Sequence, residues 1–190
     1  MKIGILTYHY GYNFGGVLQC YALQQTLKDL GYNDVHVINC IPSRLKFYLG
    51  GIPRKRQLST IYDWYLRARY GKQCRKAFND FREEFLSQTK FIKRSALPQN
   101  INNFDALIVG SDQIWNFTFD KIFSDKALGA FVPSEKRVSF SASFGVNYIP
   151  KEGSEEYRIC KENLKDMKAI SVREFAGKDI VKNLTGRDDI

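Results

Sequence analysis

Residues 109–116 read VGSDQIWN and bring a glycine, hydrogen-bonding side chains and a carboxylate next to an indole. The carboxylate of Asp112 can accept a proton, and the amides of Gln113 and Asn116 can bind hydroxyl groups. The indole of Trp115 offers an apolar face on which a sugar ring can stack. The same residues also fit a turn in which Asp112 caps the next segment and Trp115 fills the core, so both interpretations stay open.

A second candidate site is the glycine turn in YHYGYNFGGVLQCYALQQTLKDLGY, residues 8–32. Gly15 and Gly16 have no Cβ, so a ligand can approach their backbone, and the predicted helix that follows presents unpaired N–H groups at its start. An anion or a sugar hydroxyl fits there. The spacing matches neither G-x-G-x-x-G nor the Walker lysine loop, so no nucleotide is indicated. A tight turn needed only for packing a helix on a sheet explains the glycines equally well.

Polar residues also follow the ends of other predicted strands. In an open parallel sheet, ligands bind beyond the carboxyl ends of the strands, so these residues are candidates for one shared site. A lone Ser or Asp at such a place more often caps a helix or binds a loop, but four strand ends of this kind together favour a ligand site. The residues are Thr7 and His9, Ser111 and Asp112, Ser141 and Ser143, and Arg173 and Glu174.

A parallel sheet would bring these side chains together, and the sequence predicts one. Short apolar segments alternate with helical stretches, which is typical of an α/β fold: a Rossmann-like parallel sheet with helices on both faces. The length of 190 residues favours one domain, residues 1–190. The predicted strands are KIGILTYH, DVHVINC, DALIVGS, RVSFSAS and AISVRE, and helices are predicted up to Leu30, near 151–166 and up to LTG at 184–186.

Residues 42–97 interrupt this alternation and are predicted to be a basic, helical insertion. Cys74, Phe78, Phe81 and Phe85 form an apolar stripe at helical spacing, which predicts a helix that packs this stripe on the sheet. The alternative is a membrane-surface contact. The cations of 44–56 lie beside aromatic residues, a combination that suits anionic lipid head groups.

The charge and the cysteine and histidine content of the chain indicate which kinds of partner and site to expect. There are 29 Lys and Arg against 20 Asp and Glu, a net charge of +9, which suggests anionic partners without choosing among them. The four cysteines are widely separated and are predicted to be reduced thiols. No metal site and no cofactor are expected, since His9 and His36 are the only histidines. The sequence shows no signal peptide and no apolar run of about 20 residues, so we expect a cytoplasmic protein. The basic segment 44–56 adds the expectation of a peripheral contact at the inner face of the membrane.

The segments NFGGVLQCYALQQTLKDLGY, FDALIVGSDQIWN, KRVSFSASFG and AISVREFAG together resemble the polysaccharide pyruvyl transferase family. Their order and spacing make the combination specific, and it covers nearly the whole chain. The resemblance implies the N-terminal domain of a two-domain enzyme similar to GT-B glycosyltransferases. It also implies transfer of a carboxyvinyl or pyruvyl group from phosphoenolpyruvate to a sugar of a polysaccharide or a lipid-linked oligosaccharide precursor, as in exopolysaccharide biosynthesis.

Members of this family usually carry a second Rossmann-like domain, which is absent from this chain, so the resemblance implies an N-terminal half that is inactive alone. The alternative is a non-catalytic carbohydrate-binding Rossmann-like module. Nucleic-acid binding through the basic insertion is a weaker hypothesis, because the sequence contains no recognised nucleic-acid motif and isolated basic clusters are usually solvated. We therefore expect no nucleic-acid partner.

The resemblance also suggests roles for the candidate residues. Asp112 and His9 are candidates for the catalytic base, and Arg173 can bind the carboxylate or phosphate of phosphoenolpyruvate bidentately. His9 as a hydrogen-bonded strand-end residue, and Arg173 as an ion-pair partner of Glu174, are the structural alternatives. The predicted substrate-binding residues are Asn13, Gly15, Gly16, Ser111, Gln113, Trp115, Asn116, Ser143 and Arg173.

Overall fold

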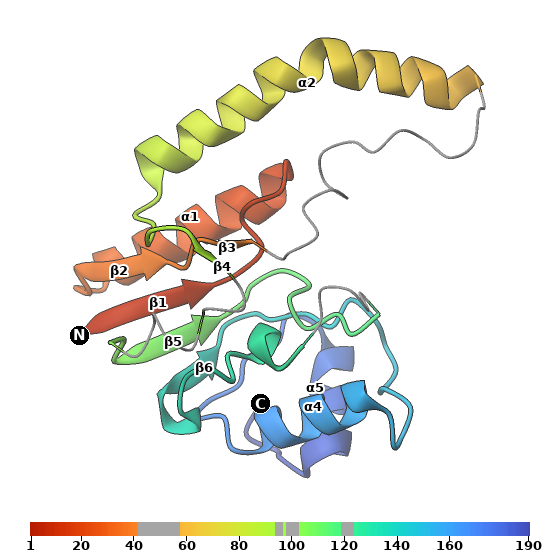
Figure 1. Ribbon diagram of the computed structural model, residues 1–190. Coiled ribbons are helices and arrows are strands. Elements are labelled where there is room, and N and C mark those ends of the chain that lie inside the picture. Colours follow the sequence, from red (N-terminus) through yellow and green to blue (C-terminus); the bar gives the residue numbers. More distant parts are fainter. Residues whose placement is uncertain (42–57, 94–96, 98–102, 119–123) are drawn as a thin grey trace.

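A parallel sheet of four strands lies at the centre of the molecule (Figure 1). Its order is β2–β1–β5–β6, so that β1 has β2 on one side and β5 on the other. The strands are β1 (Lys2–Leu6), β2 (Asp34–Val37), β5 (Ala106–Val109) and β6 (Arg137–Ser139). The computed structural model describes residues 1–41, 58–93, 97, 103–118 and 124–190, with the backbone alone for 41, 58–70 and 93.

The strands form because their sequences are short, apolar and rich in β-branched residues. Ile3 pairs with Val35 on one side and with Ala106 on the other, and Val109 pairs with Ser139. Most side chains of β1 and β5 are buried on both faces of the sheet, as is typical of parallel strands covered on both sides. The predicted α/β fold with a Rossmann-like parallel sheet is confirmed.

The predicted strand AISVRE does not form a regular strand, but it continues the sheet at its edge. Ala169 and Val172 make isolated parallel bridges to Val138 and Ala142. The backbone N–H of Arg173 donates to the carbonyl of Ala142 at 3.1 Å. The end of this segment therefore lies at the same edge of the sheet as the carboxyl end of β6.

Helices cover both faces of the sheet (Figure 1). Helix α1 (Phe14–Asp29) buries Cys20, Leu23 and Leu27 against Ile3 and Ile5 on one face. On the other face a larger core is built by α4 (Glu155–Lys165), by α5 (Phe175–Thr185) and by the 3-10 helix η3 (Asp125–Leu128). A second 3-10 helix, η4 (Ser134–Lys136), leads into β6.

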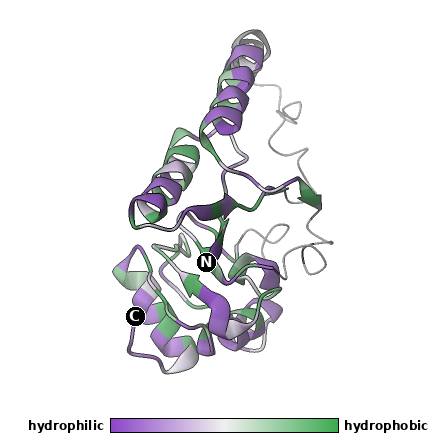
Figure 2. Ribbon diagram, turned by 90° about the vertical axis from the view of Figure 1, so that its left-hand side faces the viewer, coloured by the Kyte–Doolittle hydropathy of each residue, from purple (hydrophilic) through white to green (hydrophobic). Residues whose placement is uncertain are grey.

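Helix α2 (Leu58–Phe85) lies over α1 and reaches beyond the sheet (Figure 1). Its aromatic residues pack on α1: the ring centroids of Phe81 and Tyr21 are 5.6 Å apart, and those of Phe78 and Phe14 are 4.7 Å apart. The prediction that this stripe packs on the sheet is wrong, and Cys74, which was assigned to it, is exposed. The ribbons of α1 and α2 carry hydrophobic and hydrophilic residues in alternation (Figure 2).

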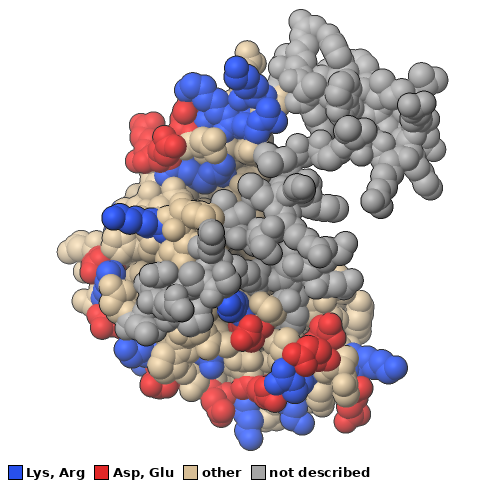
Figure 3. Space-filling model, viewed as in Figure 1, with Lys and Arg blue, Asp and Glu red and all other residues tan. Residues whose placement is uncertain are grey.

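A small second sheet, which the sequence did not predict, links the segments on either side of α2. It pairs β3 (Cys40–Ile41) in parallel with β4 (Ile92–Lys93). The basic segment 44–56 lies outside the described residues. Where the face in Figure 3 is described, basic and acidic side chains are intermixed.

The cysteines are free thiols, as predicted, and three of them are buried. Burial raises the pKa of Cys20 and of Cys160 to about 12, so neither forms a reactive thiolate near neutral pH. Among the described residues no cluster of metal-ligating side chains is found, and no helix is both long and apolar enough to cross a membrane.

Candidate functional site

The strand order gives the sheet a switch point beyond the carboxyl ends of β1 and β5, where open α/β sheets typically form a crevice. From β1 the chain passes through α1 to β2 on one side, whereas β5 lies on the other side of β1. At such a point the connections leave the sheet in opposite directions, and open α/β sheets bind their ligands there. The segments that flank this crevice are residues 7–16, after β1, and residues 110–113, after β5.

The glycine turn and the carboxylate of Asp112 meet at this crevice. A Cβ on Gly16 would lie 3.0 Å from the carbonyl oxygen of Tyr8 and 3.4 Å from Oδ2 of Asp112. Gly16 is thus required for the close approach of α1 to the ends of both strands. The structure therefore brings together the two sequence segments that were the strongest candidates for a site.

Asn13 and Gly15 lie on the exposed side of the same turn. Asn13 is the N-cap residue of α1, and its side chain accepts a hydrogen bond from the N–H of Gly16 at 3.3 Å. A helix start leaves further N–H groups without partners inside the helix, and it carries a partial positive charge. The rim of the crevice on the α1 side is therefore suited to an anion or a hydroxyl oxygen.

A ring of hydrogen bonds ties the two strand ends to α1. The hydroxyl of Thr7 donates to the carbonyl of Ser111 at 2.9 Å, and the amide of Gln19 donates to the hydroxyl of Thr7 at 2.9 Å and to the carbonyl of Gly16 at 3.0 Å. The hydroxyl of Ser111 donates to the amide oxygen of Gln19. Ser111, predicted to bind substrate, thus holds the crevice together, as does Gln19, which the sequence did not single out.

Asp112 has a backbone conformation that non-glycine residues rarely adopt, with φ at 77°. Such a residue costs about 1–3 kcal/mol relative to an ordinary conformation, and such residues cluster at functional sites. Oδ1 of Asp112 accepts from the N–H of Gln113 at 2.8 Å, and its carbonyl accepts from Ile114 and Ser143. Oδ1 is therefore engaged within the turn, while Oδ2 faces Gly16.

The sequence model of the polysaccharide pyruvyl transferase family matches residues 13–189. The chain belongs to the polysaccharide pyruvyl transferase family. The match includes both Gly16 and Asp112, so the two sides of the crevice lie within the region that defines this transferase family. No curated protein and no solved structure matches the chain. Family membership implies a sugar or polysaccharide acceptor.

The segment GSDQIWN, residues 110–116, continues from the crevice into the core. Trp115 is 0% exposed and packs on Phe144, with ring centroids 5.3 Å apart. The prediction that its ring offers a stacking face to a sugar is wrong for this structure, because the ring fills the core. Asn116 is also buried and donates to the side chain of Gln113 at 3.1 Å while it accepts from the hydroxyl of Thr118 at 2.6 Å. Asn116 therefore fixes the turn.

Ser143 and Arg173 share one partner at the edge of the sheet. The buried hydroxyl of Ser143 and Nε of Arg173 both donate to Oε1 of Glu174, each at 2.8 Å. The ion-pair alternative for Arg173 is thus observed. The Arg173 side chain remains 43% exposed, so the rest of its guanidinium is accessible from solvent, whereas Ser143 is inside.

His9 lies beneath the crevice, with 1% of its surface exposed. Burial lowers its pKa to about 4, the carbonyl of Thr7 raises it slightly, and the charge of Arg82 lowers it further. The ring is therefore neutral at pH 7, with Nδ1 3.2 Å from the Thr7 carbonyl oxygen. His9 therefore fits the alternative of a hydrogen-bonded strand-end residue. Of the two candidate bases, Asp112 is the better placed.

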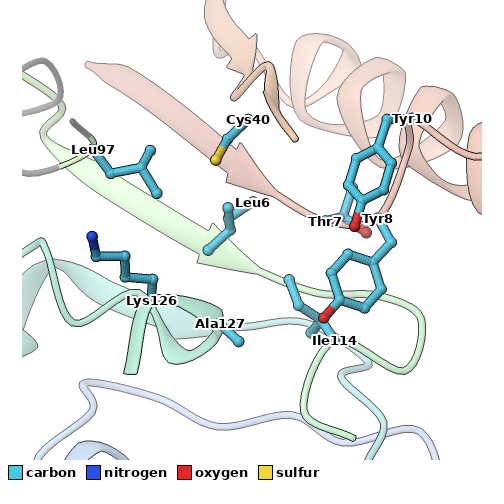
Figure 4. A pocket seen from close by; sticks show the side chains of 9 residues that line it. All are labelled: Leu6, Thr7, Tyr8, Tyr10, Cys40, Leu97, Ile114, Lys126 and Ala127. Carbon is cyan, nitrogen blue, oxygen red and sulfur yellow. The ribbon is translucent and has the colours of Figure 1, made fainter. Parts of the chain in front are cut away.

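A small pocket opens beside the crevice, on the face of the sheet away from α1 (Figure 4). Its walls are mainly apolar, and Figure 4 shows the rings of Tyr8 and Tyr10 on one side and Lys126 on another. Thr7 and Ile114 connect it to the two strand ends that flank the crevice. The lining residues are Leu6, Thr7, Tyr8, Tyr10, Cys40, Leu97, Ile114, Lys126 and Ala127.

Proposed function

We propose that the crevice between the ends of β1 and β5 is one wall of a pyruvyl transferase active site. In it, a pyruvyl group passes from phosphoenolpyruvate to hydroxyl groups of a sugar in a polysaccharide or a lipid-linked precursor. The observation that carries the proposal is the approach of Gly16 to Asp112 at the switch point of the sheet, in a chain of this family.

The proposed reaction needs a base and an anion-binding group. One sugar hydroxyl adds to C2 of the enolpyruvyl group and loses its proton while the CH2 carbon gains one. A second hydroxyl then displaces phosphate at C2, which yields the cyclic ketal and inorganic phosphate. Asp112 is suited to accept a hydroxyl proton because its half-buried carboxylate lies beside the glycine turn, with Oδ2 facing Gly16. The start of α1 is suited to hold a carboxylate or phosphate oxygen.

The test is phosphate release from phosphoenolpyruvate with a panel of sugar acceptors, measured with a C-terminal domain of the family added to the chain. We expect Asp112→Asn to lower kcat by about 100-fold or more, because the amide keeps the shape but cannot accept the proton. Asp125→Asn, which changes an exposed carboxylate of η3, is the matched control and should retain full activity. Equal rates for wild type and Asp112→Asn would exclude Asp112 as the base.

Several of the predicted substrate-binding residues already have protein partners or lie in the core. Ser143, Trp115 and Asn116 are buried, and Arg173 is paired with Glu174. We therefore propose that a second domain supplies the other wall and most of the donor contacts, and that this chain alone does not turn over. Adding a C-terminal domain of the family to the assay tests this proposal, since it should start phosphate release.

The second candidate function is a carbohydrate-binding module without catalysis. The neutral, buried His9 favours it, because this residue cannot assist Asp112 in moving a proton at the crevice. Calorimetric binding of a sugar without phosphate release in any domain combination would support the module and contradict the enzyme.

We further propose that the basic segment 44–56 contacts an anionic membrane, where each cation contributes on the order of 1 kcal/mol. Sedimentation with anionic vesicles should exceed sedimentation with neutral ones. Equal sedimentation with both, or with neither, would remove the membrane contact.

A further inference from the structure

We infer that Arg82 of α2 is a positioning residue for the crevice: it holds the loop between β1 and α1 in place from the side of the insertion. Nη1 of Arg82 donates to the carbonyl of His9 at 3.0 Å and to that of Gly11 at 3.1 Å. Nη2 donates to the side chain of Asn79 at 2.8 Å, which fixes the orientation of the guanidinium. A single planar group thus binds two backbone carbonyls of the loop.

Arg82 is unusual because it is a buried arginine without a carboxylate partner among the described residues. Only 8% of its surface is exposed, and none of the ion pairs found between described residues includes it. Its charge is offset instead by the two loop carbonyls and by the rings of Tyr12 and Phe78, whose centroids lie 6.0 Å and 5.8 Å from Cζ. Burying a charge is costly unless it is well hydrogen bonded, so the loop and the arginine depend on each other.

The loop that Arg82 holds leads directly into the crevice. Gly11 is followed by Tyr12 and then by Asn13, the cap of α1, and Gly16 at the start of α1 meets Asp112. A shift of the loop carbonyls therefore moves the glycine turn relative to the carboxylate. Since small misplacements of reacting groups reduce rates strongly, Arg82 acts on the reaction through the loop without touching a ligand.

Arg82 is not needed to attach α2 to the rest of the molecule. Phe81 and Phe85 pack on Tyr21 of α1, and the ring centroids are 5.6 Å and 5.9 Å apart. These contacts lie on the neighbouring part of the helix and do not involve the guanidinium. A variant at position 82 should therefore keep the fold while it frees the loop, which makes the inference testable.

The first experiment is amide hydrogen exchange of the full chain, measured by mass spectrometry for wild type, Arg82→Gln, Arg82→Lys and Lys72→Gln. We expect Arg82→Gln to speed exchange in residues 9–17 on the order of 10- to 100-fold, with no change in β5 or α5. Arg82→Lys keeps the charge but loses the planar fork, so it should show a smaller increase. Lys72→Gln changes an exposed cation on the same helix and should match wild type.

The inference would be overturned if the exchange rates of residues 9–17 were unchanged in both Arg82 variants. An equal increase in exchange rate over the whole chain would also overturn it. If Arg82→Gln does not fold, Arg82→Lys decides the question alone. The second experiment rests on the proposed function: phosphate release should lose about 10-fold or more in kcat with Arg82→Gln and recover in part with Arg82→Lys. Absent turnover in wild type even with a C-terminal domain of the family added would count against the proposed function, whereas the exchange result would still decide the role of Arg82.

Discussion

The two halves of the motif GSDQIWN lie in different environments, one at the crevice and one in the core. This difference shows which of its residues can contact a ligand. Its first half, residues 110–113, lies at the crevice and is half-buried from Ser111 on, with Asp112 beside the glycine turn. Its second half, residues 114–116, lies in the core, where Trp115 packs on Phe144. The backbone of Asp112 turns the chain inward between them, and the N–H of Trp115 then donates to the carbonyl of Ser143 at 3.1 Å.

The largest expected effect is a loss of stability on substitution of Trp115, in the half of the motif that lies in the core. Trp115→Ala should lower the free energy of unfolding by about 3–5 kcal/mol, because it leaves a large cavity beside Phe144. Trp115→Phe should cost far less, since Nε1 of Trp115 has no hydrogen-bond partner in the described part of the chain. Urea denaturation measures both changes. Full stability of Trp115→Ala with weaker sugar binding would show instead that the indole serves the site.

The next effect tests the buried position of His9. Its pKa of about 4 lies below the unfolded value of about 6.5, so the folded state excludes a proton that the unfolded state binds. The free energy of unfolding therefore contains a contribution from neutral His9 that is fully present above pH 6.5 and is lost as the pH falls toward 4. Between pH 7 and pH 4.5 it amounts to about 2–3 kcal/mol.

Unfolding measured at both pH values for wild type and His9→Gln checks this expectation, because the variant should lack that part of the loss. The same pH dependence in both proteins would mean that His9 is solvated and belongs to the crevice. That result would restore His9 as a candidate base.

A smaller effect contrasts two neighbouring glycines at the crevice. Gly16→Ala should cost about 1–2 kcal/mol, because its Cβ would lie 3.0 Å from the Tyr8 carbonyl oxygen, which is backbone and cannot turn aside. Gly15→Ala meets only the side chain of Asn13, at 3.3 Å, and should change stability by less than about 1 kcal/mol. Thermal denaturation compares the two. Equal stability of both variants would mean that α1 does not approach the strand ends closely.

Much of the fold could be predicted from the sequence because it depends on local pattern. The apolar, β-branched strands and the alternation with helices specify a parallel sheet covered on both faces. The packing of α2 could not be predicted, since an apolar stripe on a helix fits a sheet and another helix equally well. The β3–β4 pair was missed because each strand is only 2 residues long.

The site was predictable where it depends on topology. The residues that follow β1 and β5 were expected to share one site because the carboxyl ends of parallel strands lie at one edge of the sheet. Gln19 and Arg82 were missed because their partners lie far away in the chain. A signal for Arg82 is present, since Phe78, Arg82 and Leu86 recur at intervals of four and are all buried, and a cation in such a series indicates a buried partner.

The most direct test of the proposed crevice is an amide NMR titration of the full chain with phosphoenolpyruvate and with sugar acceptors. We predict that the N–H signals of Gly15, Gly16, Asp112 and Gln113 shift on binding, because these groups line the crevice, whereas the indole signal of Trp115 stays unchanged in the core. Shifts confined to the helix α2 or to the pocket around Lys126, with none at Gly16 and Asp112, would contradict it.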